Sequence, residues 1–159
     1  MITASITLSG YTVLLALHIA CAVLWVGGGF TMHAFGRIAQ KSGDRVRMNQ
    51  FAIDAAFIGP RFYAPLSILL LVFGSFLVDK AGYEMSATWV GIGWAGWIIS
   101  FLIGILYYSR ADKRRAQIVE TDSIGSDAFL ASYRQVQRVN TIELTILLLV
   151  VLDMAIKPT

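Results

Sequence analysis

Two histidines inside long apolar segments are the residues best suited to chemistry in this sequence. His18 lies in a segment without charged residues, and Cys21 and Trp25 follow it at spacings of three and seven residues. At those spacings the three side chains share one face of a helix. Neutral imidazole is a common ligand of haem iron and of copper. His18 is therefore predicted to be the metal or haem ligand, with Trp25 packing on a bound macrocycle.

A second set of polar side chains stands where the apolar segments begin or end. It consists of His33, Arg61, Asn140 and Glu143. We expect these residues to meet near one end of a helix bundle. An ion pair between Arg61 and Glu143 would reduce the penalty of burying either charge.

The helices that must position these residues are unusually apolar. Of the 159 residues, 57% are hydrophobic and 14% are charged, against roughly a quarter charged in an average soluble domain. Residues 1–36, 62–78 and 85–109 contain no Asp, Glu, Lys or Arg. This composition excludes a disordered chain, a disulfide-rich scaffold and a nucleic-acid-binding domain. An integral membrane protein embedded in a lipid bilayer is predicted.

Four segments are long enough to cross a bilayer, whose core of about 30 Å requires about 20 apolar helical residues. They cover about 11–35, 61–78, 88–109 and 140–156. The predicted fold is an all-α four-helix membrane bundle that forms a single transmembrane domain over residues 1–159.

The basic residues predict the orientation of this bundle. Eleven of the thirteen Lys and Arg residues lie in 37–61 and 110–138, and only Lys80 and Lys157 lie elsewhere. The positive-inside rule places these two segments in the cytoplasm and both termini outside. The prediction is a multi-pass protein of the bacterial inner membrane with periplasmic termini and one short extracytoplasmic loop.

The two longer loops have helical patterns of their own. Residues 110–120 prolong the third span, and 126–139 place apolar residues at helical spacing, with Ser126 as a candidate cap. Residues 44–58 show a similar pattern. We expect 44–58 and 126–139 to form cytoplasmic helices against the membrane surface.

Small residues form rows on two of the spans. Gly27, Gly28 and Gly29 interrupt the first span, and the third carries a row at four-residue spacing made of Gly96, Ser100 and Gly104, preceded by Gly93. Such rows allow close approach of helix backbones, so ordinary bundle packing is the first interpretation. The alternatives are a homodimer contact on the third helix, or room for a flat ligand, with Gly28 beside it.

The function of His18 has alternatives as well. Asp153 falls in the same outer leaflet as His18, and a hydrogen bond to Asp153 or to a backbone carbonyl would make His18 a contact between helices. His18, Cys21 and Met154 could instead form a soft copper site. A symmetric dimer through the first helix would pair both His18 and His33 with their copies and hold two stacked haems.

Three stretches resemble a group of small bacterial four-helix membrane proteins. They are LLALHIACAVLWVGGGF (14–30), PRFYAPLSILLLVFG (60–74) and RVNTIELTILLLVVLDMAIKP (138–158). The group includes the HemJ-like protoporphyrinogen oxidases, the copper-resistance protein D family and an uncharacterised family of predicted integral membrane proteins. The resemblance is greatest to the uncharacterised family, and membership of the HemJ-like group would imply a tetrapyrrole pocket and b-type haem with His18 as ligand.

Three functions are compatible with these observations. The first is binding of haem b or a related tetrapyrrole at His18, Trp25, Gly28 and Asp153, with or without redox activity. The second is a non-catalytic accessory or assembly subunit of a larger membrane complex, and the third is copper handling. Soluble catalytic motifs are absent, and the sequence leaves open whether the protein is an enzyme.

Overall fold

Four long helical rods make up residues 9–156, which are the residues that the computed structural model describes. The rods cover Gly10–Lys41, Arg45–Lys80, Thr88–Thr121 and Asp127–Ile156. Each is long and apolar enough to cross a membrane, and no strand occurs between residues 9 and 156. The predicted all-α four-helix membrane bundle is confirmed. Lys157, one of the two exceptions to the charge pattern, lies outside the described residues.

Three of the rods are interrupted by a π-helical turn. The first rod consists of α1 (Gly10–Ala22), η1 (Val23–Gly27) and α2 (Gly28–Lys41), and the second of α3 (Arg45–Ile58), η2 (Gly59–Tyr63) and α4 (Ala64–Lys80). The third consists of α5 (Thr88–Leu102), η3 (Ile103–Tyr108) and α6 (Ser109–Thr121). The fourth is one helix, α7 (Asp127–Ile156). Because a π-helical turn bonds i to i+5, it shifts the helical register of the residues that follow.

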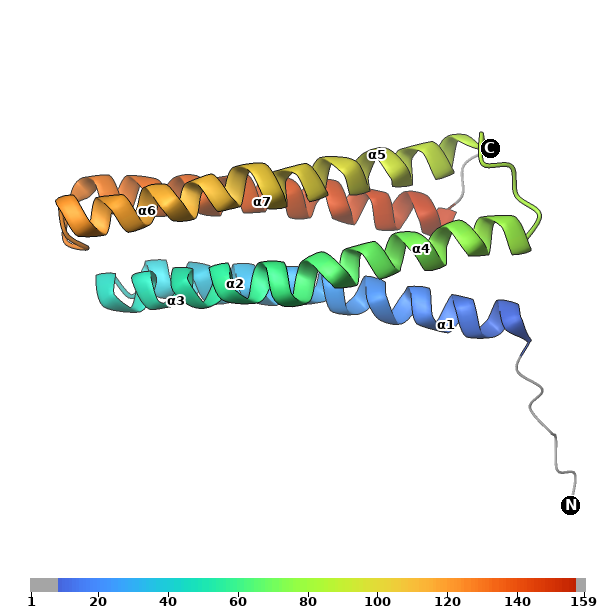
Figure 1. The fold of residues 1–159 in the computed structure, drawn as a ribbon, viewed down its shortest axis with the longest axis horizontal. Coiled ribbons are helices and arrows are strands. Elements are labelled where there is room, and N and C mark those ends of the chain that lie inside the picture. The colour runs from blue at the N-terminus through green and yellow to red at the C-terminus, as the bar shows by residue number, and fades with distance from the viewer. Residues whose placement is uncertain (1–8, 157–159) are drawn as a thin grey trace, which may run out of the picture.

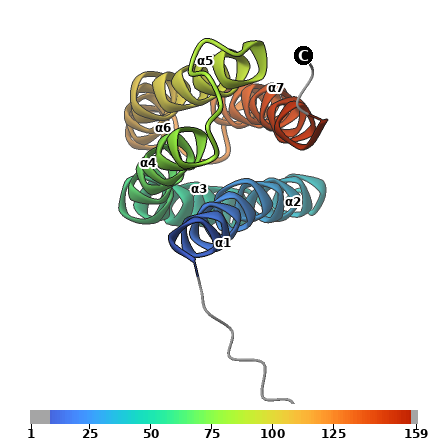
Figure 2. The same ribbon diagram turned by 90° about the vertical axis from the view of Figure 1, so that its right-hand side faces the viewer.

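The rods pack as two pairs. α1 packs along α4 and α5 packs along α7, as Figures 1 and 2 show. The turns at 42–44 and 122–126 lie at one end of the bundle, which we name the basic end because α2, α3, α6 and the first half of α7 carry most of the Lys and Arg residues. The 81–87 connection lies at the other end together with Gly10 and Ile156, and we name this the terminal end.

An apolar cluster holds the basic end together. It consists of Ala39, Met48, Phe129 and Tyr133, and the exposed fractions of Phe129 and Met48 are 0% and 1%. α3 continues the line of α4, and the first turns of α7 continue its span (Figure 1). The prediction that 44–58 and 126–139 lie against the membrane surface is therefore wrong. Met48, Phe129 and Tyr133 of these segments are buried against Ala39 of α2, whereas Val46 and Phe57 are exposed.

Two local predictions at this end are confirmed. α6 prolongs the third span, as predicted for residues 110–120. Ser126 caps α7, because its Oγ accepts a hydrogen bond of 3.1 Å from the backbone N–H of Phe129. This bond satisfies one of the N–H groups that a helix start leaves without a helical partner.

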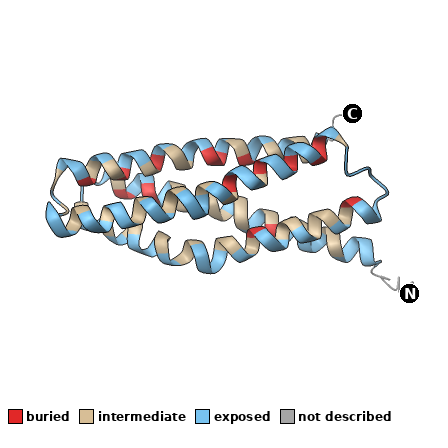
Figure 3. Cartoon of the chain, turned by 45° about the horizontal axis from the view of Figure 1, so that its top comes forward, coloured by how far each residue is buried: buried red, intermediate tan, exposed pale blue. Residues whose placement is uncertain are grey.

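The small residues of the third span are used for packing inside the chain. A Cβ atom at Gly93 would collide with Met154, and one at Gly96 would collide with Val150, both on α7. Ser100 contacts Glu143 of the same helix. The bundle-packing interpretation is confirmed for these three residues. Figure 3 shows that most positions along the rods are exposed or partly exposed within the chain. Apolar side chains such as Val23 and Leu149 are exposed where a lipid bilayer would cover them.

Candidate functional site

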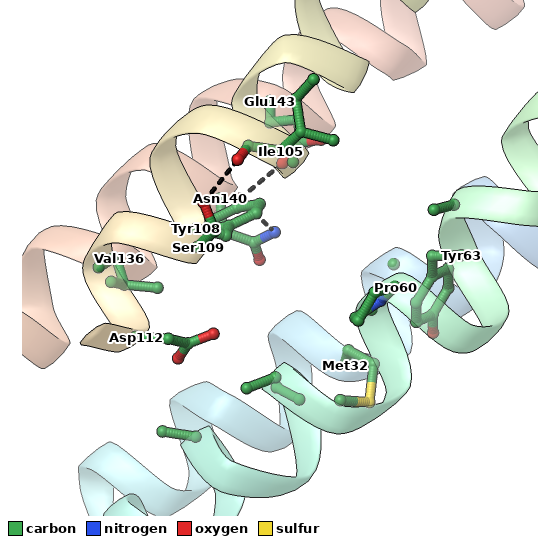
Figure 4. A pocket seen from close by; sticks show the side chains of 18 of the residues that line it. Met32, Pro60, Tyr63, Ile105, Tyr108, Ser109, Asp112, Val136, Asn140 and Glu143 are labelled. Atoms are coloured by element: carbon green, nitrogen blue, oxygen red, sulfur yellow. Dashed lines mark hydrogen bonds between the residues drawn. The ribbon is translucent and has the colours of Figure 1, made fainter. Parts of the chain in front are cut away.

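A cavity of about 510 Å³ lies between the two pairs of rods. Its wall is predominantly apolar and includes Trp25 and Met32 from the first rod and Tyr63 from the second. The third and fourth rods supply most of the polar groups, among them Ser100, Tyr108, Asp112, Arg115, Gln137, Asn140 and Glu143. Figure 4 shows Tyr108, Asn140 and Glu143 facing Tyr63, Pro60 and Met32 across this space. A mostly apolar pocket with a few converging polar groups is typical of a small-molecule site.

All three π-helical turns lie at the level of this cavity. Trp25 of η1, Pro60 and Tyr63 of η2, and Tyr108 of η3 line it. Pro60 has no N–H to give to the helical ladder, which accounts for the irregular turn in the second rod. π-helical turns are frequent at functional sites in helices. The backbone therefore departs from regular α-helix where the rods surround the cavity.

A chain of side-chain hydrogen bonds crosses one wall of the cavity. Glu143 accepts a bond from the hydroxyl of Ser100 and another, of 2.5 Å, from the hydroxyl of Tyr108. Asn140 Nδ2 donates to the Tyr108 oxygen at 3.2 Å. His33 Nδ1 lies 2.8 Å from Asn140 Oδ1, which only accepts, so His33 is the donor. The chain thus runs from His33 through Asn140 and Tyr108 to the carboxylate of Glu143.

Three members of the predicted polar cluster are thereby brought together, and the fourth is not. Arg61 is exposed, donates to the Phe57 carbonyl at 3.3 Å and lies 4.0 Å from the centre of the Phe57 ring. The predicted ion pair between Arg61 and Glu143 is wrong. The irregular turn η2 places Arg61 on the outside of the bundle, where water or lipid headgroups can solvate it.

His18 belongs to a different part of the molecule. Its Nδ1 donates to the Leu70 carbonyl of α4 at 3.0 Å, and its ring packs so closely on Gly74 that a Cβ there would lie 2.9 Å from His18 Cε1. This is the backbone-carbonyl alternative of the sequence prediction. The alternative partner, Asp153, forms no hydrogen bond and no ion pair with His18, although both lie in the described part of the chain. Asp153 is on α7, in the other pair of rods, and its buried Oδ2 has no hydrogen-bond partner.

The residues predicted to bind a cofactor are consequently divided. Trp25 lines the cavity, whereas His18, Gly28 and Asp153 do not. Gly28 packs against the side chain of Tyr63, because a Cβ atom added at Gly28 would lie 2.9 Å from the Tyr63 hydroxyl oxygen. η1 begins at Val23, between His18 and Trp25. A π-helical turn shifts the helical register, and this is the physical reason that His18 and Trp25 do not line the same site, as their spacing of seven residues had predicted.

The copper site predicted from His18, Cys21 and Met154 stays a prediction. Met154 packs against Gly93 and against the cluster around Trp89. Across residues 9–156, no three His, Cys, Asp or Glu side chains are grouped so as to hold a metal ion.

Three functional candidates escaped the sequence prediction. Ser100 appeared there only as a packing residue, and neither Tyr108 nor Arg115 stood out. Arg115 lies toward the basic end of the cavity, where its Nη1 donates to Asn49 Oδ1 at 2.7 Å and its Nε is 3.8 Å from Asp112 Oδ1. The one signal in the sequence is that Glu143 falls inside the predicted span 140–156, where a carboxyl group needs polar partners from other spans.

The fold and this site define a class, that of integral membrane proteins with four spanning helices and, between them, a mostly apolar cavity with a cluster of polar groups on one side. Residues 12–158 match the model of the family described as "Predicted integral membrane protein (DUF2269)", and the chain belongs to this family. No curated protein and no solved structure matches the chain. The predicted membership of an uncharacterised membrane family is confirmed. The wider resemblance to HemJ-like oxidases and copper-resistance protein D stays a prediction.

Proposed function

We propose that this protein binds an amphiphilic small molecule of the membrane in the interhelical cavity. The observation that carries the proposal is the cavity itself, with about 510 Å³ of space and a polar wall formed by Ser100, Tyr108, Asn140 and Glu143. This volume lies within the range of roughly 300–1,000 Å³ that is usual for ligand pockets. The apolar wall takes the body of the ligand, and the polar wall fixes its orientation.

A matched pair of glycine variants tests the proposal. Gly104 lines the cavity and Gly91 does not, and a Cβ at either position meets no atom within 4 Å. Gly104→Leu therefore fills the cavity, whereas Gly91→Leu adds the same side chain to another face of the same rod. The protein is reconstituted in lipid nanodiscs and titrated with 1-naphthylmethanol, 1-naphthylmethylammonium and 1-naphthylacetate.

Energy transfer from tryptophan to naphthalene reports binding. We expect saturable binding of at least one probe to the wild type and to Gly91→Leu, and about tenfold weaker binding to Gly104→Leu, since a leucine would occupy the space. Trp25→Phe should reduce the transfer, because Trp25 lines the cavity. Equal binding to both leucine variants, or no saturable binding of any probe, would refute the proposal.

A second candidate function, binding of haem b through His18, has an observation of its own. The Nδ1–H of His18 is fixed by the Leu70 carbonyl, which leaves Nε2 as the ring atom with a free lone pair. Histidines that ligate metals usually donate their other N–H in this way. His18 therefore fits as one axial ligand, whereas the cavity offers no histidine. Haem iron would supply redox chemistry, at the α1–α4 surface and apart from the cavity.

Absorption spectra test this second function. Wild-type protein, His18→Ala and His33→Ala are purified after expression with haem supply. We expect a Soret band in the wild type and in His33→Ala, and its loss in His18→Ala. A wild type without a Soret band, or a His18→Ala variant that keeps it, would exclude His18 as a haem ligand.

A further inference from the structure

Glu143 is a buried carboxyl group without a basic partner. The residue is 9% exposed and lines the cavity near the middle of the bundle. Its hydrogen-bond partners are the hydroxyls of Ser100 and Tyr108 and the amide of Asn140, which orient the carboxylate but carry no charge. Between residues 9 and 156 the one ion pair within 4.0 Å joins Arg115 to Asp112.

Three basic groups that could have paired with Glu143 are held elsewhere. His33 donates to Asn140, which stands between it and Glu143. Arg115 stands seven residues beyond Tyr108, about 10 Å along the helix axis, and donates to Asn49. Arg61 lies outside the bundle over Phe57. The carboxylate of Glu143 thus lacks the compensating charge that buried ions normally have.

The carboxylate also retains capacity for further hydrogen bonds. Its two oxygens offer about four acceptor positions, and Ser100, Tyr108 and Asn140 leave at least one of them for a ligand. The cavity wall nearby contains the aromatic rings of Trp25, Tyr63 and Tyr108. The faces of such rings attract cations.

We infer that the ligand of the cavity is a lipophilic cation whose charged N–H group pairs with Glu143, an amine or amidine attached to an apolar body. This inference deepens the proposed binding function and rests on it. Ser100 and Tyr108 hold the carboxylate toward the cavity, and the ligand supplies the positive charge that the protein does not. An anionic ligand would add a second negative charge beside Glu143.

The three naphthalene probes decide the question, because they share one apolar body and differ in charge. We expect 1-naphthylmethylammonium to bind wild-type protein in nanodiscs at least about tenfold more tightly than 1-naphthylmethanol, and 1-naphthylacetate to bind most weakly. Glu143→Gln should remove the preference for the ammonium probe over the alcohol. Tyr108→Phe keeps the carboxylate and should keep the preference.

The outcomes separate this inference from the proposed function. If the alcohol binds as tightly as the ammonium probe and Gly104→Leu still weakens it, the cavity binds ligands but the cationic class is wrong. The same conclusion follows if Glu143→Gln keeps the preference for the ammonium probe. If no probe binds in a saturable way, both are wrong. Should Glu143→Gln fail to fold, the ranking of the three probes on the wild type and on Tyr108→Phe still decides.

Discussion

The two histidines of the first rod differ in what surrounds them. His18, toward the terminal end, donates to a backbone carbonyl and packs on Gly74. His33, toward the basic end, begins a chain of side chains that leads through Asn140 and Tyr108 to a carboxylate at the cavity. In the first case one neighbouring helix satisfies the polar group. In the second, four side chains depend on one another, and depth in the membrane alone does not distinguish the two.

The same contrast extends to packing. At the basic end Phe129 and Met48 are as buried as residues in the core of a soluble protein. In the terminal half many large apolar side chains, Phe76 among them, remain more than half exposed within the chain and would contact lipid. Phe129 and Met48 therefore gain stability from burial within the chain, whereas an exposed side chain such as Phe76 depends on the bilayer to cover it.

The largest expected effect tests this difference in packing. Phe129→Ala should destabilise the protein by about 3–5 kcal/mol, because it leaves a cavity in a closed cluster. The matched control is Phe76→Ala, a residue that is 56% exposed, and it should change stability by less than about 1 kcal/mol. Equilibrium unfolding in mixed SDS micelles measures both. Equal losses for the two variants would show that the ends are held together in the same way.

A smaller effect is expected from breaking the side-chain chain. Asn140→Leu removes the partner of His33 and a donor to Tyr108, and should cost about 1–3 kcal/mol because polar groups are left unpaired. His18→Leu should cost less than about 1 kcal/mol, since the Leu70 carbonyl keeps its helical hydrogen bond. The same unfolding assay compares them. A larger loss for His18→Leu would reverse the contrast between the two histidines.

Tyr108→Phe sharpens the account of the chain at a lower magnitude. It removes one hydrogen bond to Glu143 and leaves Ser100 in place, so we expect a loss of about 0.5–1.5 kcal/mol. Tyr63→Phe is the control, because Tyr63 also lines the cavity but does not belong to the chain, and it should stay within about 0.5 kcal/mol of the wild type. A neutral Tyr108→Phe would show that Glu143 is held by Ser100 alone.

Much of the fold could be predicted because a membrane-spanning helix needs about 20 consecutive, mostly apolar residues, and such a segment is visible in the sequence alone. The site depends on contacts that no local pattern encodes. Ser100 and Tyr108 stand 43 and 35 residues before Glu143. Only the pairing of the third rod with α7 brings them together. The segments 44–58 and 126–139 have the apolar faces of surface helices. The sequence does not say whether such a face meets lipid or another helix. The structure does, because it buries Met48 and Phe129 in one cluster.

The smallest effect is spectroscopic and tests whether the two histidine sites are independent. The chain has two histidines, so ¹⁵N-histidine labelling gives one set of imidazole signals for each. Both rings should show protonated Nδ1, because each Nδ1 faces an oxygen that only accepts. Asn140→Leu should shift the His33 signals alone, and Gly74→Ala, which places a methyl group against the ring of His18, should shift the His18 signals alone. If either variant shifted the signals of both histidines, the surroundings of His18 and of His33 would be coupled through the first rod. The two histidines would then belong to one site, and the contrast between them would be wrong.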